Sequence, residues 1–275
     1  MQPRSTTSPL LTGAFFLIAL APKATADALA YANLSGTVFG IQDLTNGTFT
    51  QLGSNSGLVG LGEVGGTLYG ALGDTLYTVD PANGDLTTVG SGSATFEEFG
   101  STTGGLFGLD YSMNLYSIDP TTGASTLIGP TGLSLPFHNG LSAGSSTLYF
   151  AEEANQNTGP AALYSLNTLT GAATLIGSNS TTSAVFGPVF VDGVLYAASC
   201  GNEPACGFAP TSESIYTLDT TTGAAAFVAA STATNIPDGM APVLTPEPSS
   251  ALLLAAAGTL IGVIARRRRQ NQCAS

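Results

Sequence analysis

One stretch of the chain decides its fold: Tyr116-Ser-Ile-Asp119-Pro-Thr-Thr-Gly123-Ala-Ser-Thr-Leu-Ile-Gly129. Its first part alternates apolar with small polar residues, which is the period of a β-strand. A turn follows, because the Asp119 side chain bonds nearby backbone, proline presets φ and Gly123 accepts a positive φ. The segment Thr-Leu-Ile returns as a second strand and ends on Gly129. The stretch therefore predicts a β-hairpin.

The same pattern occurs four more times along the chain. Its leading aromatic residue recurs at Phe39, Tyr77, Tyr116, Tyr164 and Tyr216. Repeats of about 40–45 residues are typical of propeller blades with four strands each. The repetition therefore predicts a body built from five similar units.

Two more strands are expected in front of each hairpin. The nearer strand is predicted at residues 28–34, 67–71, 105–109, 147–151 and 193–197. The other strand is predicted in the later repeats only, at residues 57–64, 94–99, 138–143 and 186–191. The first repeat has no room for it, so residues 238–244 are expected to complete that blade and close the ring.

The predicted fold class is therefore all-β, a β-propeller of about five four-stranded blades over residues 27–244. A ring of four or six blades and an open β-solenoid are the structural alternatives. The repeats also resemble those of bacterial secreted propeller proteins with a Leu-Tyr-x-Ile-Asp-x-x-Thr-Gly pattern. That resemblance concerns the fold and does not define a function.

The charges of the chain are unevenly placed. The formal net charge is −12, with 18 acidic and 6 basic side chains. The basic residues are Arg4, Lys23 and residues 266–269, so none lies between Asp27 and Thr245. Nucleic-acid binding by this middle region is excluded, because neutralising phosphates requires Lys or Arg. Phosphoryl transfer is disfavoured for the same reason.

The N-terminal end has the three parts of a secretory signal peptide. Arg4 precedes an apolar run at residues 10–21, and Ala24-Thr25-Ala26 supplies the small residues that a signal peptidase requires. The run is too short to span a bilayer of about 30 Å. Residues 1–26 are therefore predicted to be a signal peptide, cleaved after Ala26, and a buried N-terminal helix is the alternative.

The C-terminal end, residues 245–275, also combines an apolar stretch with basic residues. Pro246, Glu247 and Pro248 precede an apolar stretch at residues 251–265, which is expected to form a short hydrophobic helix. Four arginines follow, and cytoplasmic retention of positive charge would leave the acidic body outside. The arginines are Arg266, Arg267, Arg268 and Arg269.

These C-terminal residues resemble the PEP-CTERM sorting signal of Gram-negative bacteria. The resemblance implies transient insertion into the inner membrane, recognition by an exosortase and removal of the tail. It further implies export to the cell surface or extracellular matrix, often alongside exopolysaccharide and hence in biofilms. An ordinary tail anchor is the alternative.

Two of the three cysteines are close together in the sequence. Cys200 and Cys206 are predicted to form a disulfide in an oxidising compartment, with two free thiols as the alternative. His138 is the only histidine, so neither a zinc site nor a catalytic triad is indicated.

Carboxylates are the remaining candidates for chemistry. Several fall near the predicted inner strands and are candidates to converge at a central channel, where they would suit Ca²⁺: Glu98, Asp110, Glu152, Glu153 and Asp192. Solvated positions at the rim are the favoured interpretation. Asp80, Asp119 and Asp219 are explained by their turns.

Two functions remain open at this point. The favoured one is a non-enzymatic surface or matrix protein without a cofactor, which contacts exopolysaccharide or surface proteins. The alternative is a secreted propeller lyase or hydrolase that uses channel carboxylates and calcium. A catalytic base or a cationic clamp is common in enzymes, and the scarcity of such residues here favours the first.

Overall fold

The computed structural model describes residues 27–35, 37–55, 57–134, 140–152, 161–178, 185–199 and 213–243. The first nine strands are β1 (Leu29–Leu34), β2 (Val38–Asp43), β3 (Phe49–Ser54), β4 (Leu61–Val64), β5 (Thr67–Val79), β6 (Leu86–Thr102), β7 (Gly105–Asp110), β8 (Asn114–Ile118) and β9 (Ser125–Pro130). The others are β10 (Leu148–Glu152), β11 (Ala162–Leu166), β12 (Ala173–Ser178), β13 (Phe186–Val191), β14 (Val194–Ser199), β15 (Ser214–Leu218), β16 (Ala225–Ala230) and β17 (Pro237–Pro242).

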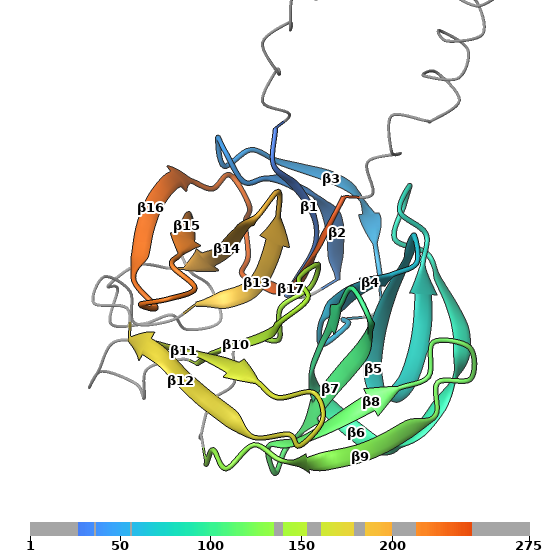
Figure 1. Ribbon diagram of the computed structural model, residues 1–275. Helices are drawn as coiled ribbons and strands as arrows, with labels where there is room; N and C mark the ends of the chain where they lie inside the picture. Colours follow the sequence, from blue (N-terminus) through green and yellow to red (C-terminus); the bar gives the residue numbers. More distant parts are fainter. Residues whose placement is uncertain are drawn as a thin grey trace, which may run out of the picture.

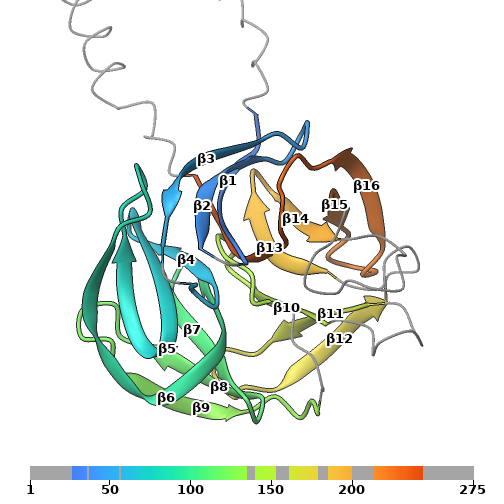
Figure 2. The ribbon, with the colours of Figure 1, turned by 180° about the vertical axis from the view of Figure 1, so that it is seen from behind.

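The strands form a propeller-like ring of antiparallel sheets around a common axis (Figure 1), and the opposite view shows the same ring (Figure 2). The sheets have the strand orders β17-β1-β2-β3, β4-β5-β6-β7-β8-β9, β10-β11-β12 and β13-β14-β15-β16. The all-β propeller-like fold is therefore confirmed. The prediction of five blades is wrong, because the described residues form four sheets.

Two local features explain why the described residues form four sheets and not the five predicted blades. β6 continues without a break from the outer strand of the second repeat into the inner strand of the third, so both repeats share one six-stranded sheet. In the fourth repeat, the strand predicted at residues 138–143 is reduced, within the described part, to isolated bridges that pair Leu141 with Phe150 and Ala143 with Val189. The sheet β10-β11-β12 therefore has three strands.

The ring closes through the last strand, as the sequence predicts. β17 pairs antiparallel with β1, with Ala30 opposite Pro242 and Ala32 opposite Met240. In Figure 1, β17 lies on the side of β1 that faces the centre of the ring. Residues from the two ends of the body are thus held in one sheet, which removes two open sheet edges.

The hairpins of the five repeats share one irregularity. In every repeat the register shifts at the leading aromatic position, as between Leu115 and Tyr116 in β8 and between Leu163 and Tyr164 in β11. Such β-bulges add twist to a strand pair. The repeated sequence therefore folds into a repeated backbone geometry even where repeats share a sheet.

The glycines that end the return strands of the first four repeats make contacts between repeats. A side chain at Gly177 would collide with the carbonyl oxygen of Thr222, which lies in the turn of the next repeat. Gly90 and Gly129 face the next turn in the same way, at Thr122 and Thr170. The repeat motif thus encodes the packing of each unit on its neighbour as well as its own hairpin.

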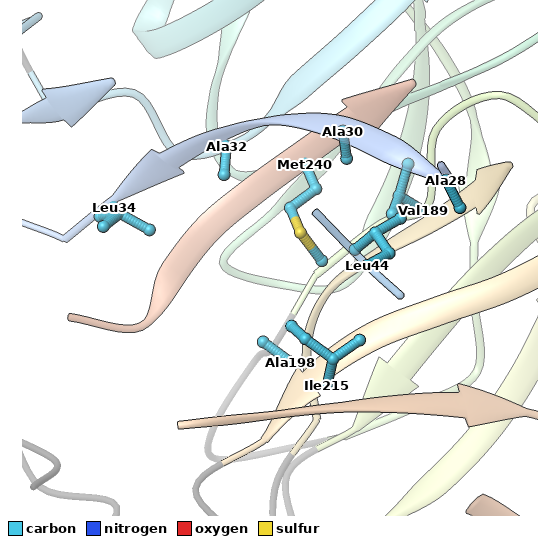
Figure 3. Close-up of a cluster of buried hydrophobic side chains, with 9 residues drawn as sticks. All are labelled: Ala28, Ala30, Ala32, Leu34, Leu44, Val189, Ala198, Ile215 and Met240. Atoms are coloured by element: carbon cyan, nitrogen blue, oxygen red, sulfur yellow. The ribbon is translucent and has the colours of Figure 1, made fainter. Parts of the chain in front are cut away.

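Apolar side chains fill the space between the sheets. One cluster joins the first sheet to the sheet of β13–β16, and Met240 of β17 lies in it with Val189, Ala198 and Ile215 (Figure 3). Neighbouring side chains of β17 face different clusters, since Ala241 packs with Tyr31 and Leu61 instead. β17 therefore contributes to the core on both of its faces.

Glycines also line the axis of the ring, where the innermost segments approach one another. A Cβ at Gly239 would lie 2.5 Å from the Gly60 Cα, and one at Gly187 would lie 3.4 Å from the Gly239 Cα. Gly100 faces the backbone of Ser142 in the same manner, and Gly140 faces Gly187. The centre is therefore packed backbone against backbone.

Several predicted features lie outside the described residues. They are the signal peptide, the Cys200 and Cys206 pair, the C-terminal hydrophobic helix, His138 and Glu153. Among the residues that the structure describes, no helix has the length and apolar character needed to cross a membrane.

Candidate functional site

Two carboxylates from different sheets interact near the axis of the ring. Glu98 lies on the inner part of β6, two residues before Gly100, and Asp238 lies on β17, directly before Gly239. Burial raises the pKa of Glu98 well above its ordinary value, and the negative charges of Glu97 and Asp238 raise it further. The innermost strands thus position an acidic pair that is far apart in the sequence.

Glu98 is the more deeply buried of the two carboxyls. Only 6% of its surface is exposed, and the desolvation of a charged carboxylate is costly in such a site. The raised pKa favours the protonated acid, which can donate a hydrogen bond.

Asp238 is held by the turn that follows β1. The Ser35 hydroxyl donates a hydrogen bond of 2.6 Å to Asp238 Oδ1, and the Asn235 amide donates one of 3.0 Å to the Ser35 carbonyl oxygen. Burial raises the pKa of Asp238, while the bond from Ser35 acts in the opposite direction. This bonding orients the carboxylate and links the last strand to the first.

A buried amide accompanies the pair on β1. Asn33 is fully buried, and its Nδ2 donates a 3.1 Å hydrogen bond to the Leu58 carbonyl oxygen. Its Oδ1 has no hydrogen-bond partner among the described residues. We call Ser35, Glu98 and Asp238 the axial polar cluster, and Asn33 is a separate buried amide on the strand that pairs with β17.

The structure separates the other predicted carboxylates. Asp110 ends β7 and accepts hydrogen bonds from the backbone and side chain of Asn114 and from the Tyr116 hydroxyl, the last at 3.1 Å. Glu152 ends β10 and accepts a 3.0 Å bond from the Tyr164 hydroxyl. Asp192 is exposed in the turn between β13 and β14.

These bonds stabilise local turns and strand pairs. Burial, the charge of Glu152 and its hydrogen bond raise the pKa of Tyr164 to about 12. Of the four described carboxylates that were candidates for a channel, only Glu98 belongs to the axial polar cluster. Within the described residues no group of three or more His, Cys, Asp and Glu side chains is arranged to hold a metal ion.

The turn interpretation of the repeated aspartates is confirmed. Asp119 Oδ1 accepts a 2.7 Å bond from the Thr121 N–H, and Asp219 Oδ1 accepts one of 2.7 Å from the Thr221 N–H. Hydrogen bonds from the side chain and then the backbone of Thr121 lower the pKa of Asp119. These aspartates are ionised and stabilise the turns of their own repeats.

Sequence reasoning missed Asn33, Asp238 and Glu213 as buried polar groups. For Asp238 the sequence contained a signal, because this residue precedes the glycine of the closing strand as Asn139 precedes Gly140. For Glu213 the sequence contained no such signal. It precedes β15 with 3% of its surface exposed, and burial raises its pKa to about 8.

We expect the ring to be more stable at pH 5 than at pH 8, because burial raises the pKa values of Glu98, Asp238 and Glu213. A raised carboxyl pKa means that the folded state holds a proton that the unfolded chain has released. Stability therefore falls as the pH rises from about 4.5 through about 8, by at most about 1.4 kcal/mol per pH unit for one group. Thermal unfolding followed by circular dichroism between pH 5 and pH 8 measures this.

The variant Glu213→Gln should flatten that dependence and melt at a higher temperature than the parent protein at pH 8. Asp74→Asn, at an exposed position within β5, is the matched control and should leave the slope unchanged. A Glu213→Gln variant with the slope of the parent protein would show that this carboxyl is not responsible.

The outer strands expose apolar side chains at matching positions. Leu127 on β9, Leu175 on β12 and Phe227 on β16 are 56%, 58% and 60% exposed. Each lies opposite the tyrosine of its hairpin, and Tyr216 contacts Phe227 edge to face at 5.8 Å. The described part of these strands therefore presents uncharged, partly apolar surface on an acidic body.

Comparison with known proteins gives one informative match. No curated protein matches the chain in sequence. A solved structure, the crystal structure of the computationally designed Ika8 protein, aligns with a TM-score of 0.37 and 12% identity, over 72% of this chain and 60% of that one. This chain thus spans less than two thirds of the designed protein, and so weak a likeness carries no argument.

The C-terminal end gives the informative match. Residues 244–269 match the PEP-CTERM protein-sorting motif, which begins directly after Val243, the last described residue of the ring. Sorting motifs of this type are processed by an exosortase. The chain therefore carries a PEP-CTERM sorting motif behind a propeller-like ring of sheets, which makes it an exported protein sorted at the membrane by an exosortase.

Proposed function

We propose that this chain is a non-enzymatic protein of the cell surface or extracellular matrix of a Gram-negative bacterium. Its ring contacts exopolysaccharide or surface proteins after a signal peptidase and an exosortase have removed the two ends. The sorting motif at residues 244–269, directly behind a closed ring, is the observation that carries the proposal. The released body would have no Lys or Arg and would retain 17 of the 18 acidic side chains.

The body has surface features that suit such a role. The exposed side chains of Leu127, Leu175 and Phe227 lie on strands without charged residues. Apolar and hydroxyl groups together suit neutral polysaccharide or protein partners, whereas the acidic body would repel anionic ones. A pull-down with native exopolysaccharide tests the contact, and complete absence of retention would contradict a polysaccharide partner.

Mass spectrometry of the exported protein tests the processing. We expect a product that begins at Asp27 and ends near Pro246, Glu247 and Pro248. Replacing these three residues by alanine should stop removal of the tail, so that the cells accumulate precursor that retains residues 266–269. Asp74→Asn is the control and should be processed normally. A mature product of unchanged mass from the alanine variant would contradict the proposal.

A second candidate is a secreted lyase or hydrolase, with calcium as a candidate cofactor. The observation in its favour is the raised pKa of Glu98 in the axial polar cluster, which suits a general acid. Polysaccharide cleavage abolished by Glu98→Gln, or a melting temperature that rises with calcium, would favour this function. Equal melting temperatures with calcium and with chelator, and no cleavage, would favour the first.

A further inference from the structure

The two ends of the ring differ, and the first sheet shows which end carries the sorting motif. Val243 donates a 3.1 Å backbone hydrogen bond to Leu29, and Pro242 lies opposite Ala30. The chain therefore enters the ring and leaves it side by side, at one end of the β1–β17 pair. At the other end of that pair lie Leu34 and Pro237, which are also opposite each other.

The other repeats have tight turns where the first sheet has the two chain ends. The innermost strand joins the next strand through residues 65–66, 103–104 and 192–193 in these units. Parallel bridges pair Thr102 with Ser145 and Ala143 with Val189, so the inner segments run in the same direction around the axis. We call this side of the ring the turn end.

We call the opposite side of the ring the loop end. At this side, residues 111–113 join β7 to β8, the second and third strands of their unit. Asp238 and its partner Ser35 lie at the same end.

The tether between the ring and the apolar stretch is short. The sorting motif starts at residue 244 and the apolar stretch at residue 251, so seven residues lie between the ring and that stretch. A fully extended chain of this length spans at most about 25 Å. Because β17 is an innermost strand, the tether also leaves close to the axis, which limits how far the ring can tilt.

We propose that the membrane-inserted precursor holds its turn end toward the bilayer and its loop end away from the bilayer. This inference rests on the proposed function, since it requires the tail to insert. Exosortase cleavage then frees the turn end as well.

Energy transfer to labelled lipid tests this orientation in the full chain. An azide-bearing amino acid at Thr103 or at Tyr111 carries the donor dye, and both positions are exposed, at opposite ends of β7. Six strand residues separate them by roughly 20 Å. The precursor is reconstituted into vesicles whose outer leaflet contains acceptor lipid. We expect severalfold higher transfer rate from position 103 than from position 111.

The controls separate the inference from the proposed function. A chain ending at Val243 should give no transfer from either position. Co-flotation of the precursor with equal transfer from both positions, or with higher transfer from position 111, would overturn the orientation and leave membrane sorting intact. Failure of the precursor to float with vesicles would overturn both.

Discussion

Ending the chain at Ile236 should abolish cooperative folding of the ring, whereas ending it at Val243 should not. The shorter chain lacks β17, which supplies the inner strand of the first sheet and pairs with β1 from Ala30 to Leu34. Met240 and Ala241 are almost completely buried, in two different core clusters. Loss of one buried Met side chain alone costs about 2–5 kcal/mol.

The remaining losses add to that cost. Truncation opens the inner edge of β1 and removes the Ser35–Asp238 hydrogen bond. Whole domains are stable by only about 5–15 kcal/mol, so the total is comparable with the entire stability. Thermal unfolding and size-exclusion chromatography of the two chains, both starting at Asp27, measure the effect. A cooperative transition in the shorter chain within a few degrees of the longer one would contradict closure by β17.

The second large effect is expected for Gly239→Val at the axis. A Cβ at this position would lie 2.5 Å from the Gly60 Cα and 2.5 Å from the Leu61 nitrogen, which are backbone atoms of the neighbouring sheet. Backbone atoms cannot move aside as the end of a flexible side chain can. The added valine side chain would therefore force the inner segments apart. We expect a loss of about 3 kcal/mol or more, at the upper end of overpacking effects.

A loss of that size should lower the melting temperature of a body of this length by about 10 °C. Gly104→Ala is the matched control, because the nearest atom to its added Cβ would be the Thr102 Oγ1 at 3.7 Å, an ordinary contact. Circular dichroism melts at pH 5 and pH 8 compare the variants with the parent protein. Equal melting temperatures for Gly239→Val and Gly104→Ala would show that the axis is not tightly packed.

Local sequence was sufficient to predict the hairpins and the closure of the ring. Alternating residues and Asx-Gly turns act over a few neighbours, so Tyr116 to Gly129 could be interpreted without knowing what surrounds it. The missing strand of the first repeat similarly pointed to its replacement near Asp238. Both interpretations depend on chemistry that is local or on a simple count of strands.

The number of sheets could not be predicted in this way. β6 has the residues expected for two separate strands, and only its extended path between two repeats joins them into one sheet. The role of Gly177 was also hidden, since its close neighbour, Thr222, belongs to the next repeat. Contacts of this kind depend on how neighbouring units are rotated relative to each other.

The candidate site also contains residues that local sequence explained and residues that only the tertiary structure explains. The aspartates of the turns were correctly explained by their own neighbours, and the sorting motif is contiguous and was recognised from residues 246–248 and the terminal arginines. Asp110 and Glu152 were candidates for a channel, with solvated rim positions as the favoured interpretation, and local sequence did not indicate that tyrosines of the following strand bind them. Burial of Glu98 and Glu213 depends on the assembled ring.

By itself, the sequence determined the sorting motif of the protein, its strand pattern and the closure of its ring, because these depend on short contiguous signals. Tertiary structure alone decided how many sheets form, which glycines pack closely at the axis and which carboxyl groups are buried. It also decided that the sorting motif leaves from the turn end. Each of these depends on distances between residues that are remote in the chain, and packing around the ring sets those distances.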